Sequence, residues 1–246
     1  DKSVINNNGS LYLKDTIITG GTNNAVTHNK GTIGFEGDVT LDSSTYALYN
    51  KTDLELAGGT IAGINNSGNL TLKGNVLVKP NSGTPGINNT ASVTMDGGAI
   101  NAVSNKGVYN NSGSAIFTMN GGSITTSSFG VENYVAGSSF TMNNGTILST
   151  AAETIVNRGG TTMTINDGTI TATSNVALWE QGTCCSYDTV INIEGGTITG
   201  YNRGIYAHYY SVLNISGGTI QNTHLTNSTD NSVIFIDNRT NVNITG

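Results

Sequence analysis

Residues 117–124 read Phe-Thr-Met-Asn-Gly-Gly-Ser-Ile, and variants of this phrase recur along the chain. In each variant two apolar residues flank a polar one, a turn of small or polar residues follows, and the copy closes on Ile. The copies lie at 54–61, 93–100, 117–124, 140–147, 163–170, 191–198 and 213–220. The closing Ile returns about every 22–24 residues, a period typical of solenoid repeats. The period lengthens to about 28 in the segment that contains Cys184 and Cys185.

Weaker copies extend the repeat toward both ends of the chain. Apolar–polar–apolar triplets lie at 11–13, 39–41, 70–72 and 242–244. The repeat therefore covers nearly the whole sequence, and no linker interrupts it. We expect one domain over residues 1–246. Because the chain begins without a signal peptide and its last triplet ends abruptly, we also expect it to be a piece of a longer surface protein.

A second phrase lies between the copies of the first and consists of Gly, an aliphatic residue, a variable residue and Asn. It occurs at 63–66, 86–89, 107–110 and 130–133. Each period then contains three short strands separated by turns rich in Gly and Asn. The recurring Asn should stack from one turn to the next, which predicts a ladder of side-chain amides bonded along the axis.

These patterns predict an all-β fold, a single right-handed parallel β-helix with three short strands per coil. Ten or eleven coils stacked at about 4.8 Å would form a rod roughly 50 Å long. A β-propeller needs longer blades, a left-handed β-helix needs hexapeptide periodicity, and calcium-binding nonapeptide repeats need a Gly-Gly-x-Gly-x-Asp phrase. None of these patterns is present.

The composition excludes several classes of protein. Only 11% of residues are charged, the net charge is −6, and no basic cluster is visible. A nucleic-acid partner would require Lys and Arg gathered on one face, so we expect none. No apolar run is long enough to span a membrane. Cys184 and Cys185 are adjacent and have no Cys or His at metal-ligand spacing, so we expect no metal and no cofactor.

The coils resemble the right-handed β-helix repeats of the pectate-lyase-like superfamily. The Gly-Gly-Thr-Ile-Thr-Gly phrase at 195–200 and the Gly-Val-x-Asn phrases resemble adhesin-like surface proteins of gut bacteria and archaea. The resemblance covers nearly the whole chain, but its motifs are structural. It implies a fold and a cell-surface location, and it carries no catalytic residue.

Acidic and imidazole side chains are the first candidates for chemistry. Glu132 is expected to face outward with Arg158 one coil further on, and Glu180 follows later. No column repeats Asp or Glu on neighbouring coils, so we expect these acids to be solvated surface residues. The three histidines, at 28, 208 and 224, are far apart in the repeat and are also expected at the surface.

Aromatic residues give a stronger indication of binding. The variable, outward position of the second phrase holds Tyr109, Trp179 and Tyr206, and the last two should be direct neighbours. We expect a binding cluster that contains the following residues: Trp179, Glu180, Tyr206, His208, Tyr209 and Tyr210. Tyr109 and Glu132 are expected to form part of the same outward surface several coils away. Exposed rings suit sugars or protein partners, although such rings also cap turns.

The sequence thus predicts a non-enzymatic binding or adhesion module of a bacterial cell-surface protein, located outside the cell. Its partner would be a host glycan or a host protein, such as mucin or an immunoglobulin. A polysaccharide lyase or glycoside hydrolase of the β-helix type is the alternative, and it requires two carboxylates, or a carboxylate and an Arg, converging in a groove. A structural stalk without a ligand is the second alternative. The oligomeric state stays open.

Overall fold

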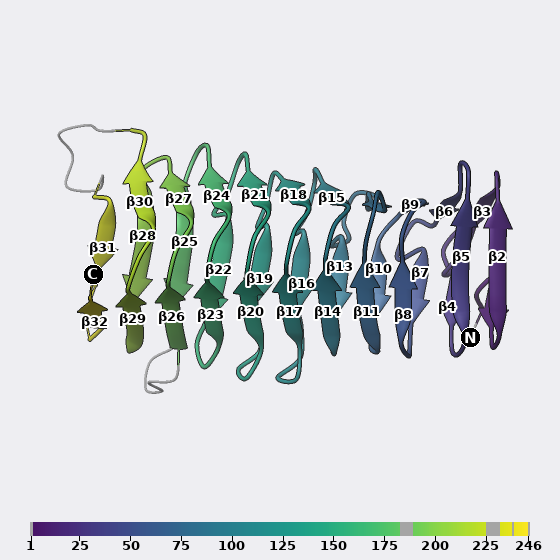
Figure 1. Ribbon diagram of the computed structural model, residues 1–246, viewed down its shortest axis with the longest axis horizontal. Coiled ribbons are helices and arrows are strands. Elements are labelled where there is room, and N and C mark those ends of the chain that lie inside the picture. Colours follow the sequence, from purple (N-terminus) through teal and green to yellow (C-terminus); the bar gives the residue numbers. More distant parts are fainter. Residues whose placement is uncertain (1, 183–188, 225–231, 238, 246) are drawn as a thin grey trace.

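The computed structural model describes the whole chain except residues 1, 183–188, 225–231, 238 and 246. The described residues form short β-strands and no helix, so none of their segments is a helix that could cross a membrane. The strands stack into an elongated rod whose ends hold the two ends of the chain (Figure 1). This confirms the parallel β-solenoid that the repeat predicts.

The longest sheet, here called the amide sheet, contains eleven parallel strands. These are β1 (Ile5–Asn7), β4 (Val26–His28), β7 (Leu48–Asn50), β10 (Ile64–Asn66), β13 (Ile87–Asn89), β16 (Val108–Asn110), β19 (Val131–Asn133), β22 (Ile155–Arg158), β25 (Val176–Gln181), β28 (Arg203–His208) and β31 (Ile234–Ile236).

The second sheet, here called the threonine sheet, contains nine strands. These are β8 (Leu54–Leu56), β11 (Asn69–Leu72), β14 (Ser92–Met95), β17 (Ile116–Met119), β20 (Ser139–Met142), β23 (Thr162–Ile165), β26 (Thr189–Ile193), β29 (Ser211–Ile215) and β32 (Asn241–Ile244). The corresponding strands of the first two turns, β2 (Ser10–Lys14) and β5 (Thr32–Glu36), pair only with each other.

The third sheet, here called the isoleucine sheet, contains ten strands. These are β3 (Ile17–Thr19), β6 (Thr40–Asp42), β9 (Thr60–Ile61), β12 (Leu77–Val78), β15 (Ala99–Ala102), β18 (Ser123–Thr126), β21 (Thr146–Ser149), β24 (Thr169–Ala172), β27 (Thr197–Gly200) and β30 (Thr219–Asn222). Nine turns therefore share the continuous threonine sheet, and the β2–β5 pair precedes them.

Stacking in register explains why this sequence adopts this fold. Apart from β5 and β8, strands in the same position of successive turns pair in parallel, as Phe117 pairs with Phe140 and Met119 with Met142. Equivalent apolar residues therefore form columns that fill the interior, where the rings of Phe117 and Phe140 stack 5.1 Å apart. The residue between them points outward, and Thr118 and Thr141 continue the predicted Thr column.

The predicted amide ladder is present inside the amide sheet. Along this ladder the Nδ2 atom of one buried Asn donates to the Oδ1 atom of the Asn in the next turn, in five bonds of 2.7–3.0 Å. The bonded series is Asn50, Asn66, Asn89, Asn110, Asn133 and Asn157. Several members also donate to a backbone carbonyl of the threonine sheet, as Asn110 does to Ser139 at 3.1 Å. The ladder therefore joins successive turns and adjacent sheets.

The small residues after the threonine sheet are required by geometry. Gly145 has φ +109°, and a Cβ there would lie 2.6 Å from Met119 Cε, inside van der Waals contact. Gly168 has φ +100° and meets Met142 Cε in the same way. A side chain at either position would strain the backbone and displace a core methionine.

One weak copy of the repeat was assigned to the wrong sheet. We expected residues 39–41 to be a copy of the Thr-containing phrase, but Leu41 pairs with Ile18 and Ile61 in the isoleucine sheet. The strand that takes the Thr-sheet position in this turn is β5, whose sequence contains Gly34 and Phe35. Gly34 hides the repeat, because it stands where the other copies have a polar residue between two apolar ones.

The buried ladder should stabilise the fold far more than amides at the surface do. Replacing Asn110 by Ala removes bonds to two neighbouring turns and leaves buried polar groups without partners. We expect a loss of about 2–3 kcal/mol in the free energy of unfolding. The matched control is Asn120→Ala in the same turn, because Asn120 belongs to an exposed amide row. This replacement should lower the free energy of unfolding by only about 0.5 kcal/mol. Urea unfolding followed by circular dichroism measures both, and equal losses would contradict the assignment.

Candidate functional site

Three aromatic rings occupy one outward column of the amide sheet on successive turns. Trp179 pairs with Tyr206, as the sequence predicts, and Tyr206 pairs with Phe235. The Trp179 and Tyr206 rings are nearly parallel, at 12°, with centroids 6.4 Å apart, and Phe235 meets the Tyr206 ring edge-on at 5.2 Å. These residues form what is here called the aromatic stripe. All three are half-buried, so the stripe presents a partly open apolar surface.

Polar and charged groups border the aromatic stripe. The His208 ring contacts Tyr206 and Tyr209 edge-on, and its Nε2 atom lies 3.2 Å from Asp237 Oδ2. The guanidinium of Arg203 lies over the rings of Tyr206 and Phe235, 5.0 and 4.5 Å from their centroids. Sequence reasoning missed Phe235 and Asp237 because the last turn lacks the Gly-aliphatic-x-Asn phrase.

Tyr210 does not belong to this surface, contrary to our prediction. Its side chain is 8% exposed and lies beneath the guanidinium of Arg239 at 4.9 Å. Tyr209, by contrast, is exposed and contacts His208. The two neighbours diverge because both have positive φ, 49° for Tyr209 and 45° for Tyr210, which turns the chain sharply at the end of β28.

The indole of Trp179 carries a hydrogen-bond donor that pairs with none of the described residues. Its Nε1 atom is shielded from solvent and has no acceptor among the described residues. A buried Trp N–H usually has an acceptor, because leaving such a donor unpaired costs free energy. This donor adds a polar group to an otherwise apolar stripe.

Glu180 lies inside the solenoid, so the prediction of a solvated surface acid is wrong. It takes the amide-ladder position, pairing in register with Asn157 and Ala207, and its side chain is fully buried. Its Oε2 atom accepts a 2.9 Å bond from the His208 backbone N–H. Burial raises the pKa of Glu180 to about 7, although bonds from Ser211 and His208 oppose the shift. The amide ladder ends at Asn157, because Glu180 and then Ala207 take its next two positions.

Glu132 is also buried, although it takes the outward position that we predicted. Its Oε1 atom lies 2.6 Å from Arg158, which donates from the guanidinium, and its Oε2 atom lies 2.5 Å from Lys106 Nζ. These cations and the rings of Tyr109 and Tyr134 enclose the carboxylate, with Lys106 Nζ 3.9 Å from the centre of the Tyr109 ring. Burial, with a smaller effect from Glu132, raises the pKa of Tyr109 to about 12. This group is here called the Glu132 cluster.

The Glu132 cluster and the aromatic stripe belong to the same outward surface of the amide sheet. Tyr109, Glu132, Val156 and Trp179 are successive partners in one column. Arg158 connects the two groups, because it bonds both Glu132 and Gln181 of β25. Sequence reasoning identified Tyr109, Glu132 and Arg158. It missed Lys106, which precedes β16, and Tyr134, which follows β19, because these positions lie outside the strands and are not fixed by the repeat.

His28 was expected at the surface but is buried in the amide-ladder column of the second turn. Its Nδ1 atom lies 2.9 Å from Asn7 Nδ2, and its Nε2 atom lies 3.3 Å from the Asp53 carbonyl. Burial lowers the pKa of His28, opposed by the bond to Asp53. The neutral imidazole therefore replaces an amide as donor and acceptor.

No three His, Cys, Asp or Glu side chains of the described residues are grouped as they would be around a metal ion. Cys184 and Cys185 lie outside the described residues. Comparison of the chain with models of protein families, with curated protein sequences and with solved structures found no match. The chemistry of the site must therefore be argued from its own geometry.

The buried carboxyl of Glu180 should make stability depend on pH. Its pKa is higher in the folded state, about 7, than the ordinary value of 4.5. The folded state therefore holds a proton that the unfolded state releases, and stability falls as pH rises from 4.5 through 7. Glu180→Gln removes this dependence. The melting temperature of the variant relative to wild type should rise between about pH 5 and pH 7 and level off at higher pH.

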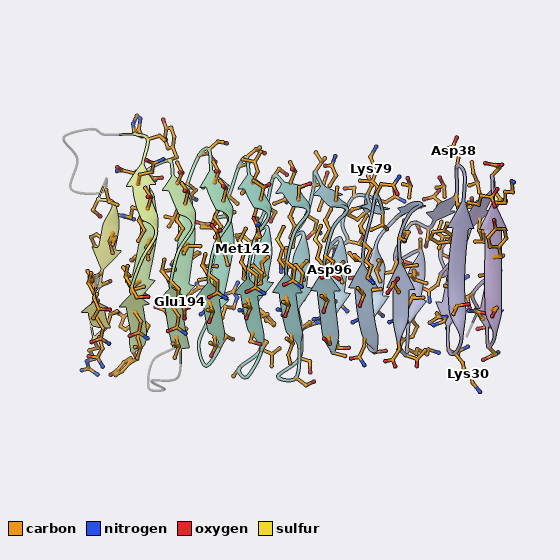
Figure 2. The ribbon with its side chains drawn as sticks, in the orientation of Figure 1. Lys30, Asp38, Lys79, Asp96, Met142 and Glu194 are labelled. Carbon is orange, nitrogen blue, oxygen red and sulfur yellow. The ribbon has the colours of Figure 1, made fainter. Side chains whose placement is uncertain are left out.

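Glu194→Gln is the matched control, because Glu194 is exposed on a turn beside β26 (Figure 2). Its melting temperature relative to wild type should stay constant across the same pH range. A constant difference for Glu180→Gln as well would show that the Glu180 carboxyl titrates as an ordinary solvated acid.

Proposed function

We propose that the chain is a non-enzymatic binding module of an extracellular, cell-surface protein, and that the aromatic stripe is its contact surface. The observation that carries the proposal is the alignment of Trp179, Tyr206 and Phe235 on three successive turns. The three rings follow one another over roughly 10 Å, two inter-turn spacings, a length of apolar surface that suits a sugar chain or an elongated protein epitope.

The groups around the stripe support recognition of a hydroxyl-rich ligand. Tyr206, His208 and Tyr209 supply polar groups at the margin of the stripe. Pockets for sugars and other small molecules combine apolar rings with a few placed polar atoms. A host glycan is therefore the favoured ligand, and a host protein such as mucin or an immunoglobulin is the other candidate.

The Glu132 cluster bears on the alternative of a lyase or hydrolase. A carboxylate and an Arg do converge there, as that alternative requires. However, the Glu132 carboxylate is fully buried and both of its oxygens are engaged by cations. A carboxylate held in this way is a poor base, because a general base must reach the proton that it removes. The cluster better serves to fix Arg158 and Lys106 beside Tyr109 and Tyr134.

A glycan array tests the proposal with the wild-type chain and the Trp179→Ala variant. We expect specific binding that falls at least about 30-fold in the variant, the loss of a contact worth about 2 kcal/mol. Trp179→Phe keeps a ring and should retain most of the binding. Tyr134→Ala is the control, because Tyr134 is an exposed ring outside the stripe.

Three outcomes separate the possible ligands and sites. Binding that survives Trp179→Ala would place the contact surface elsewhere. A blank array followed by binding to immobilised mucin or immunoglobulin would keep the stripe and change the ligand. Absence of binding to any of these probes would contradict a binding module and support a structural stalk.

A further inference from the structure

The side of the rod that carries the threonine sheet is interrupted between the second and third turns. β5 pairs only with β2, and β8 pairs only with β11, so no ladder joins β5 to β8. The same two turns remain paired in the other sheets, through β4–β7 and β6–β9. Figure 1 shows the β2–β5 pair set apart from β8. Two strand edges thus face each other on an otherwise continuous surface.

Side chains on both sides of the break are adapted to it. In regular turns the ladder Asn donates to a carbonyl of the next turn, as Asn89 does to Ile116 at 3.0 Å. At the break this position holds His28, whose longer side chain spans the wider gap to the Asp53 carbonyl. The Phe35 ring packs against Gly59, where an added Cβ would lie 2.7 Å from it. The break is therefore built into the sequence.

A trough runs along the break and consists of three adjoining hollows of about 390, 560 and 370 Å³. The first two share Glu55, and the second and third share Asp38 and Asn75. The trough follows β5, whose two ends are marked by Lys30 and Asp38 in Figure 2. Hollows of this size lie in the range of small-molecule sites.

The lining of the trough is polar and anionic. Its side chains include the carboxylates of Asp38, Asp53 and Glu55 but no Lys or Arg, and they also include hydroxyl and amide groups such as those of Thr71 and Asn69. Asp53 accepts a 2.7 Å bond from Asn69, and Glu55 lies 2.6 Å from Lys73, yet each carboxylate has further lone pairs.

An exposed ring lies next to the trough. The Tyr12 side chain is 61% exposed, and it lies against Gly34, where an added Cβ would be 3.3 Å from the ring. Gly34 belongs to the lining of the largest hollow. The absence of a side chain at Gly34 therefore leaves room for a flat aromatic face beside a row of hydrogen-bonding groups.

We propose that the β5–β8 trough is a second binding site, which takes a neutral, linear oligosaccharide lying along β5. Sugar hydroxyls donate to carboxylates and accept from amides and free backbone N–H groups, and the Tyr12 ring offers an apolar face to a pyranose. An anionic glycan is disfavoured, because three carboxylates line the trough and Lys73 is paired with one of them, Glu55, while no lining residue is a Lys or an Arg.

The spacing of the strands argues against a peptide as the occupant. An extra strand inserted between β5 and β8 would need about 9.6 Å, two inter-strand distances. Cα atoms of β5 and β8 approach within 8 Å of each other. A peptide could not pair with both edges unless the turns separated, whereas an oligosaccharide on the surface of the trough needs no such movement.

This site is independent of the aromatic stripe. The trough lies between the second and third turns, and β25 lies six turns beyond β7, roughly 30 Å along the axis at one inter-strand spacing per turn. Changes at Trp179 should therefore leave binding in the trough intact, and changes in the trough should leave the stripe intact.

Isothermal titration calorimetry with neutral hexasaccharides (cello-, xylo- and mannohexaose) and with hexagalacturonate tests the proposal. We expect at least one neutral hexasaccharide to bind, and hexagalacturonate to bind at least tenfold more weakly. Hydrogen exchange of the backbone amides of residues 32–36 should slow when the neutral ligand binds to the wild-type chain. Trp179→Ala should bind this ligand as wild type does.

A matched pair of variants locates the site. Thr71→Arg places a long side chain in the trough and should weaken binding of the neutral ligand at least tenfold. Thr118→Arg makes the same change in the same outward column, two turns away from the hollow, and should bind as wild type does. No binding by any neutral hexasaccharide, equal effects of the two variants, tight binding of hexagalacturonate or unchanged exchange at 32–36 would each overturn the proposal.

Discussion

The structure depends on one buried hydrogen bond repeated from turn to turn, between the side-chain amides of the ladder. An amide enclosed by apolar columns needs a partner above and below, because an orphaned polar group in the interior is costly. Only one register supplies both partners. A slip by one residue would also turn every core side chain outward. Within the ladder the spacing between bonded Asn residues ranges from 16, Asn50 to Asn66, to 24, Asn133 to Asn157. The loops absorb this variation while the ladder keeps the strands aligned.

Much of this fold could be predicted from the sequence, because in a solenoid the columns of the structure are the repeats of the sequence. The outward Thr column, the inward Phe and Met residues and the Asn ladder all follow from position within the period. The contact between Trp179 and Tyr206 follows for the same reason. Such arguments need no knowledge of distant contacts, since each turn touches chiefly its neighbours.

Burial of individual polar residues could not be predicted in this way. Glu132 takes an outward position, but Lys106 and Arg158 from neighbouring turns enclose it. Glu180 is buried because its strand continues one residue past the aromatic position into the ladder column. The break beside β5 was hidden for a related reason, since residues 39–41 imitate a phrase that belongs to another sheet. Departures from the repeat are where sequence reasoning fails, and they coincide with both candidate sites. His28 replaces the ladder amide at the trough, and Glu180 replaces it beside the stripe.

The ladder also has a direction. In each of its five amide bonds the Asn of the N-terminal turn donates and the Asn of the C-terminal turn accepts. The amide dipoles therefore point the same way and add along the axis, as peptide dipoles do in a helix. The positive end of this row faces the turn of Glu180, where an acidic residue takes the next position. The interior of the rod is thus electrically polar from Asn50 to Asn157, although the surface columns are mostly neutral, and the two ends of this row present opposite partial charges to the turns that adjoin them.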